Sequence, residues 1–450
     1  MQRGLWAGIC AAGLLFGQVQ AQQPAAPEVL EIATTPTQLA QTVPSLQSSG
    51  ATGCPAESQP LQQTAATGQP EQKLGPTPSP ATPPSLLMMF LQGTWEGDVL
   101  NSQQIRISGY VDGGYTYATS GPGHLSVEPL PNRFGDEFTF NQLFLMIERP
   151  LDPRQLSWGF AIASWTGADA ALLRPVKGAI FPNPNPRFSF EVPNALLKVH
   201  LPVLTEGGVD IEVGEHLPLS GYEPALPTFR NFYSNDYQFF YGLPGIFTGV
   251  LVTTHVNQQL DLVGAVTTGT PTFFATLSVA PTYIGVVNYW LEESKKTQIS
   301  LRLLCGPYNP QSNVVTTIEN VTLTRKWNEY LTQAVQLYAC YSNAGIFVPG
   351  LERAYGLYTI FICRVTPKVN LNFRAEWYDD VDGRAYPGGT GFKTNYEAMT
   401  VAVDYHPTTW LQLRPELRAD FANNAPAFGP VGGPLNHSQL TAAIECLIKF

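Results

Sequence analysis

Charged side chains recur at every second position in several short segments of this chain. In residues 409–421, Arg414, Glu416, Arg418 and Asp420 alternate with leucine, alanine and phenylalanine. Because alternate side chains of a β-strand point to opposite faces, this spacing predicts a charged face backed by an apolar one. Such a face can bind ions and polar solutes if it borders a confined, water-filled space.

The same alternation recurs in residues 105–112, 209–213, 298–305 and 369–378. The candidate pore-lining charges are Arg106, Asp112, Asp210, Glu212, Arg302, Arg374, Glu376, Arg414, Glu416, Arg418 and Asp420. A structural role is the alternative for each of them, because neighbouring arginine and carboxylate side chains can neutralise one another and hold a wall rigid.

The sequence shows few of the residue patterns that are typical of enzymes. The histidines show no metal-ligand spacing, and they stand at His124, His200, His216, His255, His406 and His437. Neither a nucleophile-elbow nor a phosphate-loop pattern occurs. We therefore predict no catalytic residues, no metal and no cofactor. An outer-membrane hydrolase, the weakest alternative, would have to use His124 or His437 with a nearby carboxylate.

Composition limits which elements can carry these faces. The chain has 13% charged and 11% aromatic residues, and its mean hydropathy is −0.04. Average soluble domains carry about 25% charged residues, whereas helical membrane proteins are far more apolar. A transmembrane β-barrel fits both values because its lipid-facing and lumen-facing residues alternate. The net charge of −10 without a basic block predicts no nucleic-acid partner.

Connections between the alternating segments are short and long in turn. Short turns are predicted at 150–154, 204–208, 257–258, 292–296, 326–328, 366–368 and 406–409. Longer loops are predicted at 118–137, 166–188, 217–245, 269–274, 309–313, 343–354, 379–393 and 422–436. Tight periplasmic turns and longer outer loops are typical of outer-membrane barrels. The pattern predicts an all-β, transmembrane antiparallel barrel of about sixteen strands over residues 104–450, with fourteen as the alternative.

The N-terminal region has a different character. Residues 1–21 resemble a secretory signal peptide, with Arg3 before a short apolar stretch and a predicted cleavage after Ala21. Residues 22–103 form a predicted disordered periplasmic spacer rich in Gln, Pro, Thr and Ala, with a possible short helix at 85–92. No later apolar run is long enough for a transmembrane helix.

Two further features favour an outer-membrane barrel. The final segment places Ile444, Cys446, Ile448 and Phe450 on one face, as in the C-terminal signal for barrel assembly. Aromatic residues gather near the predicted strand ends, as in the interfacial girdles of such barrels. They are Tyr115, Tyr117, Trp158, Trp165, Tyr289, Trp290, Trp327, Tyr330, Tyr405 and Trp410.

Several stretches of residues 104–450 resemble the OmpL-like family of outer-membrane β-barrel porins. RISGYVDGGYTYA at 106–118 and FNQLFLMIERPLDP at 140–153 are similar to its opening strands. DIEVGEHLPLSGYEP at 210–224 and FYSNDYQFFYGLPGIFTGVLVT at 232–253 are similar to its central signature. NLNFRAEWYDDVDGRA at 370–385 and WLQLRPELRAD at 410–420 resemble its closing strands.

The resemblance implies a pore in the outer membrane. We expect passive diffusion of small hydrophilic solutes or ions through the barrel. Loop 217–245 is the longest predicted connection, which makes it the candidate constriction, with a surface lid as the alternative. The expected partners are outer-membrane lipid, the barrel-assembly machinery, the solutes and a possible homo-oligomer. The alternative is a barrel-anchored surface or structural protein, an adhesin or envelope tether, without channel activity.

Overall fold

The structure is a computed structural model. It describes residues 85–127, 132–171, 174–180, 185, 187–219, 221–242, 244–308, 314–343, 352–383 and 393–450. The predicted signal peptide and residues 22–84 of the predicted spacer lie outside the described residues and remain predictions.

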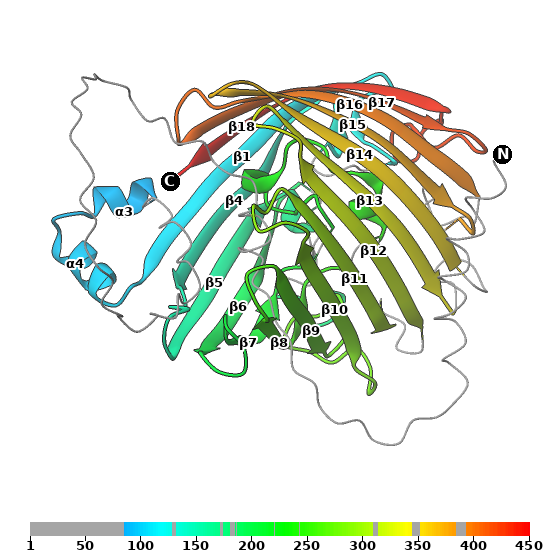
Figure 1. The fold of residues 1–450 in the computed structure, drawn as a ribbon. Helices are drawn as coiled ribbons and strands as arrows, with labels where there is room; N and C mark the ends of the chain where they lie inside the picture. Colours follow the sequence, from blue (N-terminus) through cyan, green and yellow to red (C-terminus); the bar gives the residue numbers. More distant parts are fainter. Residues whose placement is uncertain are drawn as a thin grey trace, which may run out of the picture. The chain divides into compact units, whose positions relative to one another are not determined.

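Sixteen antiparallel strands form one closed barrel, which confirms the predicted fold class and the higher of the two predicted strand numbers (Figure 1). The strands are β1 (Arg106–Ala118), β4 (Glu137–Arg149), β5 (Ser157–Gly167), β6 (Ser189–Leu201), β7 (Val209–His216), β8 (Phe247–His255), β9 (Leu260–Thr267), β10 (Thr282–Trp290), β11 (Thr297–Pro307), β12 (Val315–Lys326), β13 (Leu331–Ser342), β14 (Glu352–Thr366), β15 (Val369–Asp380), β16 (Thr394–Tyr405), β17 (Leu411–Ala422) and β18 (Ser438–Lys449). Two short strands, β2 (Gly123–His124) and β3 (Phe134–Gly135), pair with each other in the loop between β1 and β4.

The period-two pattern of the sequence separates the two faces of the barrel wall. On β17, Leu417 and Phe421 expose 57% and 45% of their surface on the outer face. Arg414 and Arg418, at alternate positions, are fully buried on the inner face. Register carries the pattern from strand to strand, since Arg418 pairs with Thr400 on β16, which is also fully buried. The apolar face therefore points outward and the charged face points into the lumen.

The last strand closes the barrel against the first. β18 pairs with β1 from Tyr110 opposite Lys449 to Ala118 opposite Thr441. The backbone N–H of Gly109 donates to the carbonyl of Phe450 at 2.9 Å, and the N–H of Phe450 donates back at 2.8 Å. Ile444 and Ile448 are exposed on the outer face, as the C-terminal pattern requires. A role of this strand in assembly stays a prediction.

Most residues of the predicted aromatic girdle are exposed on the outer surface, but two are not. Trp165 is 1% exposed, because it lies on the inner face of β5 with Ala161 and Ala163, and its ring lies edge-on to Phe144. Trp290 is 8% exposed because it shares the inner face with Asn288, while Tyr289 between them points outward. Both tryptophans therefore lie on the inner face of the wall, and their assignment to the girdle was wrong.

Two helices precede the barrel. The predicted helix within 85–92 is present as α3 (Leu86–Phe90), and Ser85 caps it by accepting the N–H of Met88. The sequence did not predict α4 (Trp95–Ser102), which Thr94 caps in the same manner. Among the described residues, no helix combines the length and apolar character needed to span a bilayer.

Candidate functional site

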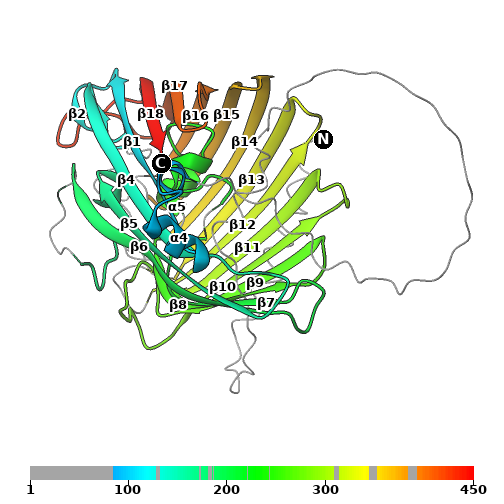
Figure 2. The same cartoon turned by 90° about the vertical axis from the view of Figure 1, so that its left-hand side faces the viewer.

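Between β7 and β8, the described residues 217–219, 221–242 and 244–246 cross the lumen to the opposite wall. In the ring of sixteen strands, β15 lies eight strands away from β7 in either direction. Residues of this loop nevertheless bond to side chains of β15, β17 and β18, as described below. The loop contains a short 3-10 helix, η3 (Pro227–Phe229), and the helix α5 (Tyr237–Gly242), which lies within the ring of strands (Figure 2). We call residues 217–246 the inner loop.

Two carboxylates of the wall bind backbone N–H groups of the inner loop. Glu416 on β17 accepts the N–H groups of Tyr233 at 2.8 Å and of Ser234 at 3.2 Å. Glu376 on β15 accepts the N–H of Tyr237 at 2.8 Å, at the start of α5. Charge-assisted bonds to successive N–H groups fix both the position and the direction of this segment.

Arginines of the same wall bind the oxygen atoms of the segment. Arg374 on β15 donates to the carbonyl of Ser234 at 2.8 Å and to its hydroxyl at 3.0 Å. Arg418 on β17 donates to the carbonyl of Asn235 at 3.1 Å and pairs with Glu376 at 2.8 Å. The alternating wall charges thus bind both the N–H groups and the carbonyl groups of the loop backbone.

Aromatic rings of the inner loop cover these guanidinium groups. The ring of Phe232 lies 4.7 Å from the guanidinium carbon of Arg374, and Tyr237 lies 4.8 Å from that of Arg418. The Tyr237 hydroxyl also donates to Asp420 at 2.5 Å. Stacking on an aromatic face strengthens a cation's contacts when water is excluded. The charges are therefore buried under the loop.

Arg414 forms a second anchor on β17. Its guanidinium pairs with Glu445 on β18 and donates to the carbonyls of Arg230 at 3.1 Å and Phe232 at 3.1 Å. Arg230, from the loop, lies 3.5 Å from Glu445 and 3.8 Å from Asp112 on β1. Two arginines and two carboxylates from four chain segments therefore meet in this cluster.

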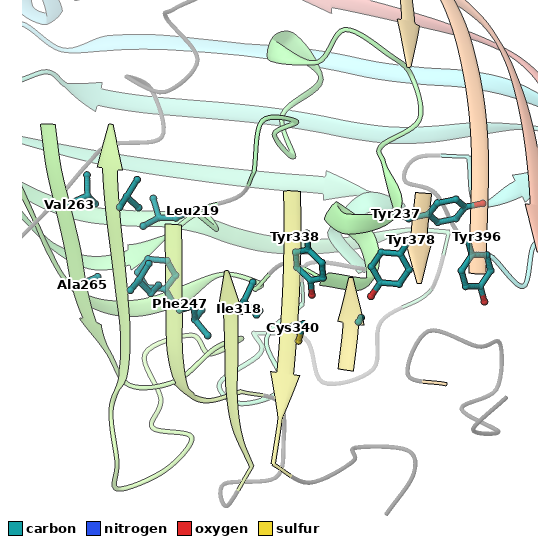
Figure 3. Close-up of a cluster of buried hydrophobic side chains, with 14 of the residues drawn as sticks. Leu219, Tyr237, Phe247, Val263, Ala265, Ile318, Tyr338, Cys340, Tyr378 and Tyr396 are labelled. Atoms are coloured by element: carbon teal, nitrogen blue, oxygen red, sulfur yellow. The ribbon is translucent and has the colours of Figure 1, made fainter. Parts of the chain in front are cut away.

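The inner loop also contacts β13. Gln336 accepts the N–H of Tyr222 at 2.8 Å and donates to Gln238 at 2.9 Å, while the hydroxyl of Tyr338 donates to the carbonyl of Gly242 at 3.0 Å. Figure 3 shows Tyr338 and Tyr237 in one row with Tyr378 and Tyr396. Tyr237 lies 5.1 Å from Tyr396 and 6.5 Å from Tyr378, measured between ring centroids. These rings extend the contact between α5 and the wall.

Burial shifts the acidity of two carboxyl groups on the inner loop. It raises the pKa of Asp236 well above its usual range, and nearby Glu223 and Glu376 raise it further. Burial also raises the pKa of Glu223, which Arg374 opposes from 2.6 Å. Burial therefore opposes the charged forms of Asp236 and Glu223.

The structure brings together seven of the predicted pore-lining residues around the inner loop. They are Asp112, Arg374, Glu376, Arg414, Glu416, Arg418 and Asp420. Four others lie apart from this group. Asp210 bonds to His200 at 2.6 Å, Glu212 lies 4.0 Å from Lys198, Arg302 donates to Thr322 at 3.2 Å, and Arg106 is exposed where β1 begins. A pore-lining role for these eleven residues stays a prediction.

Sequence reasoning missed four residues that hold the inner loop: Glu223, Arg230, Ser234 and Glu445. Glu223 and Ser234 stand in the Gly-Tyr-Glu and Tyr-Ser stretches of the central signature, so the resemblance carried a signal for them. Glu445 alternates with the apolar residues of the closing strand, and the period-two pattern could have identified it. Nothing in the spacing of the sequence pointed to Arg230.

Comparison with solved structures supports the fold. The outer membrane channel DcaP of Acinetobacter baumannii superposes with a TM-score of 0.52 and 12% identity, over 77% of this chain and 97% of that chain. OmpF of Salmonella typhi, in complex with daunomycin, gives a TM-score of 0.53 and 10% identity, over 78% and 99%. Outer-membrane expressed OmpT of Vibrio cholerae gives 0.50 and 10%, over 77% and 97%. At these identities the likeness concerns the fold alone.

No curated protein matches this chain in a sequence comparison. The family described as "Putative beta-barrel porin-2, OmpL-like" matches residues 104–450, which is the whole barrel including the inner loop. Its match and the sixteen-stranded closed barrel imply a location in the outer membrane. The chain belongs to this OmpL-like family of β-barrel porins.

Proposed function

We propose that the protein is a passive diffusion pore for small hydrophilic solutes or ions, with the inner loop as its constriction. The observation that carries the proposal is the path of that loop from β7 to the opposite wall, where Glu416 and Arg374 hold Ser234. A barrel of sixteen strands is wide enough for an aqueous channel, and a loop folded into it narrows that channel.

The wall charges would then have two roles. The charges under the inner loop would fix the width of the constriction by holding the loop in place. Arg374, Arg414 and Arg418 are fully buried, and their guanidinium N–H groups donate to carbonyl oxygens of the loop. Charges away from it, such as Arg302, would act on the solute itself. This division favours the structural alternative for the buried arginines and leaves selectivity to fewer residues.

Conductance of the purified, folded chain in a planar bilayer tests the proposal, with ion selectivity taken from the reversal potential. We expect discrete, stable steps. A variant in which a short Gly/Ser linker replaces residues 221–242 should conduct several-fold better, because the loop would then no longer narrow the channel. Folding of both proteins is checked by heat-modifiable migration on a gel.

Silence from a correctly folded wild-type barrel would overturn the pore and favour the surface or structural protein without channel activity. Conductance that the linker variant leaves unchanged would keep the pore but remove the inner loop as its constriction. Binding of lipid and of the assembly machinery, cleavage after Ala21 and a homo-oligomeric state remain predictions of the same proposal.

A further inference from the structure

We infer that residues 85–103, which form the α3–α4 hairpin, bind zwitterionic phospholipid at the surface of the membrane beside the barrel rim. This inference rests on the outer-membrane location and is independent of the proposed diffusion pore. The hairpin precedes β1, at the end of the barrel where β1 begins and β18 ends (Figure 1). The short turns between strands lie at this end, which marks it as the periplasmic end.

An apolar surface of the hairpin has no cover among the described residues. Phe90 and Trp95 expose 80% and 72% of their surface, and Met89 and Val99 expose 52% and 48%. All four belong to α3 or α4. Apolar groups gathered in this way on a short segment mark a surface that meets a protein or a membrane.

Packing inside the hairpin sets the direction of this surface. Gly97 of α4 is buried against Leu91, and a methyl group on Gly97 would lie 2.0 Å from the carbonyl oxygen of Leu91. At about 100° per residue, Trp95 and Val99 fall on the side of α4 opposite to Gly97. The close approach of the two helices therefore turns Trp95 and Val99 away from α3.

Hydrogen bonds fix the hairpin to the barrel beside its outer apolar surface. The hydroxyl of Ser85 donates to the carbonyl of Ile107 on β1 at 2.5 Å. The guanidinium of Arg149 on β4 donates to the carbonyl of Gln103 at 3.1 Å, and it also lies 4.3 Å from the ring of Trp158. The C-terminus of α4 and an outward-facing tryptophan of the barrel thus share one arginine.

This continuity selects lipid as the occupant. Trp158 on β5 is 57% exposed and Leu156, in the turn before it, is 68% exposed, so the apolar surface of the barrel runs up to the hairpin. Tryptophan and phenylalanine beside polar groups are typical of segments that lie in the membrane interface. The acidic residues of α4, Glu96 and Asp98, offer nothing to an anionic headgroup, so the expected lipid is zwitterionic.

Depth-dependent fluorescence quenching tests the inference on the full chain in phosphatidylcholine bilayers. The lipid carries a nitroxide near the glycerol end of its acyl chain, and iodide serves as the quencher in water. The contribution of Trp95 is the emission lost in Trp95→Phe, and Trp158→Phe gives the matched contribution from the barrel surface. We expect nitroxide lipid to quench both contributions to a similar extent, and iodide to quench neither strongly.

A second variant tests whether the apolar surface of the hairpin is what contacts the lipid. Replacing Phe90 and Val99 by aspartate should move the Trp95 contribution from lipid quenching to iodide quenching, while heat-modifiable migration of the barrel stays unchanged. Strong iodide quenching of Trp95 in the wild-type protein would overturn the inference. Shielding of Trp95 from both quenchers would also overturn it, since the spacer or a second copy of the chain would then cover the hairpin.

Discussion

The carboxylate of Glu416 accepts the backbone N–H of Tyr233 at 2.8 Å, although the two residues are 183 positions apart in the chain. Glu416 lies on β17, the second-last strand of the barrel, and Tyr233 lies in the loop that follows β7. This bond and its neighbours convert a loop that could extend outward into one held inside the lumen. The predictions below test that arrangement and the orientation of the barrel wall.

Replacing Glu416 by glutamine should loosen the inner loop. A neutral amide oxygen accepts the two N–H groups more weakly than the carboxylate does, since hydrogen bonds to charged groups are worth about 1.5–3 kcal/mol each and those between neutral groups about 0.5–1.5 kcal/mol. We expect higher single-channel conductance with more open-channel noise. The control is Glu319→Gln on β12, which pairs with the outward-facing Leu303. Equal behaviour of the two variants would show that Glu416 does not hold the constriction.

Replacing Arg374 by methionine should destabilise the attachment of the inner loop by more free energy than the loss of a neutral hydrogen bond would. The change leaves Glu223 and Glu376 buried without this partner, at a cost of about 3–5 kcal/mol when one member of a buried pair is removed. Proteolysis within residues 221–242 should become faster while the strands stay intact. Combining Arg374→Met with Glu223→Gln should recover part of the protection, and no recovery would argue against a direct pair.

The buried carboxyl of Asp169 should make the free energy of unfolding depend on pH. Burial raises its pKa to about 6 from a usual value of 3.8, while Arg230 and Gln142 oppose the rise. Because the folded-state pKa is the higher one, the stabilisation is full below pH 3.8 and is lost as pH rises through about 6. Asp169→Asn should therefore raise the free energy of unfolding by at most about 3 kcal/mol at neutral pH, and by little under acidic conditions. Denaturant titrations at the two pH values measure the difference, and an equal effect at both would contradict it.

Replacing Leu417 by arginine tests which face of the wall meets lipid. Leu417 is exposed on the outer face near the middle of β17, where an arginine costs about 2–4 kcal/mol in a bilayer. Tyr405→Arg, at the end of β16, is the matched control and should cost no more than about 1 kcal/mol. Unfolding titrations in lipid vesicles measure both values. Equal costs would place Leu417 outside the hydrocarbon region.

The strands and their faces could be predicted from the sequence because both depend on local spacing. Alternation of Arg414 and Arg418 with Leu417 fixes the two faces of β17, and the same rule gave the closing strand that carries Ile444 and Ile448. Short and long connections gave the strand number. The same rule places Trp165 on the inner face of β5 with Ala161 and Ala163, so its assignment to the girdle failed because it considered only the position near the strand end and not the face.

Only the tertiary structure decided where the inner loop lies and which charges meet. Arg374 reaches Glu223 across 151 positions, and Arg414 reaches the carbonyl of Arg230 across 184, so no local pattern links these partners. Their contact depends on closing sixteen strands into a ring, which places β15 opposite the origin of the loop. The sequence by itself determined a barrel with a charged interior. The ring closure decided that much of this charge holds a loop, because a buried arginine is stable only beside partners that the closed barrel brings to it.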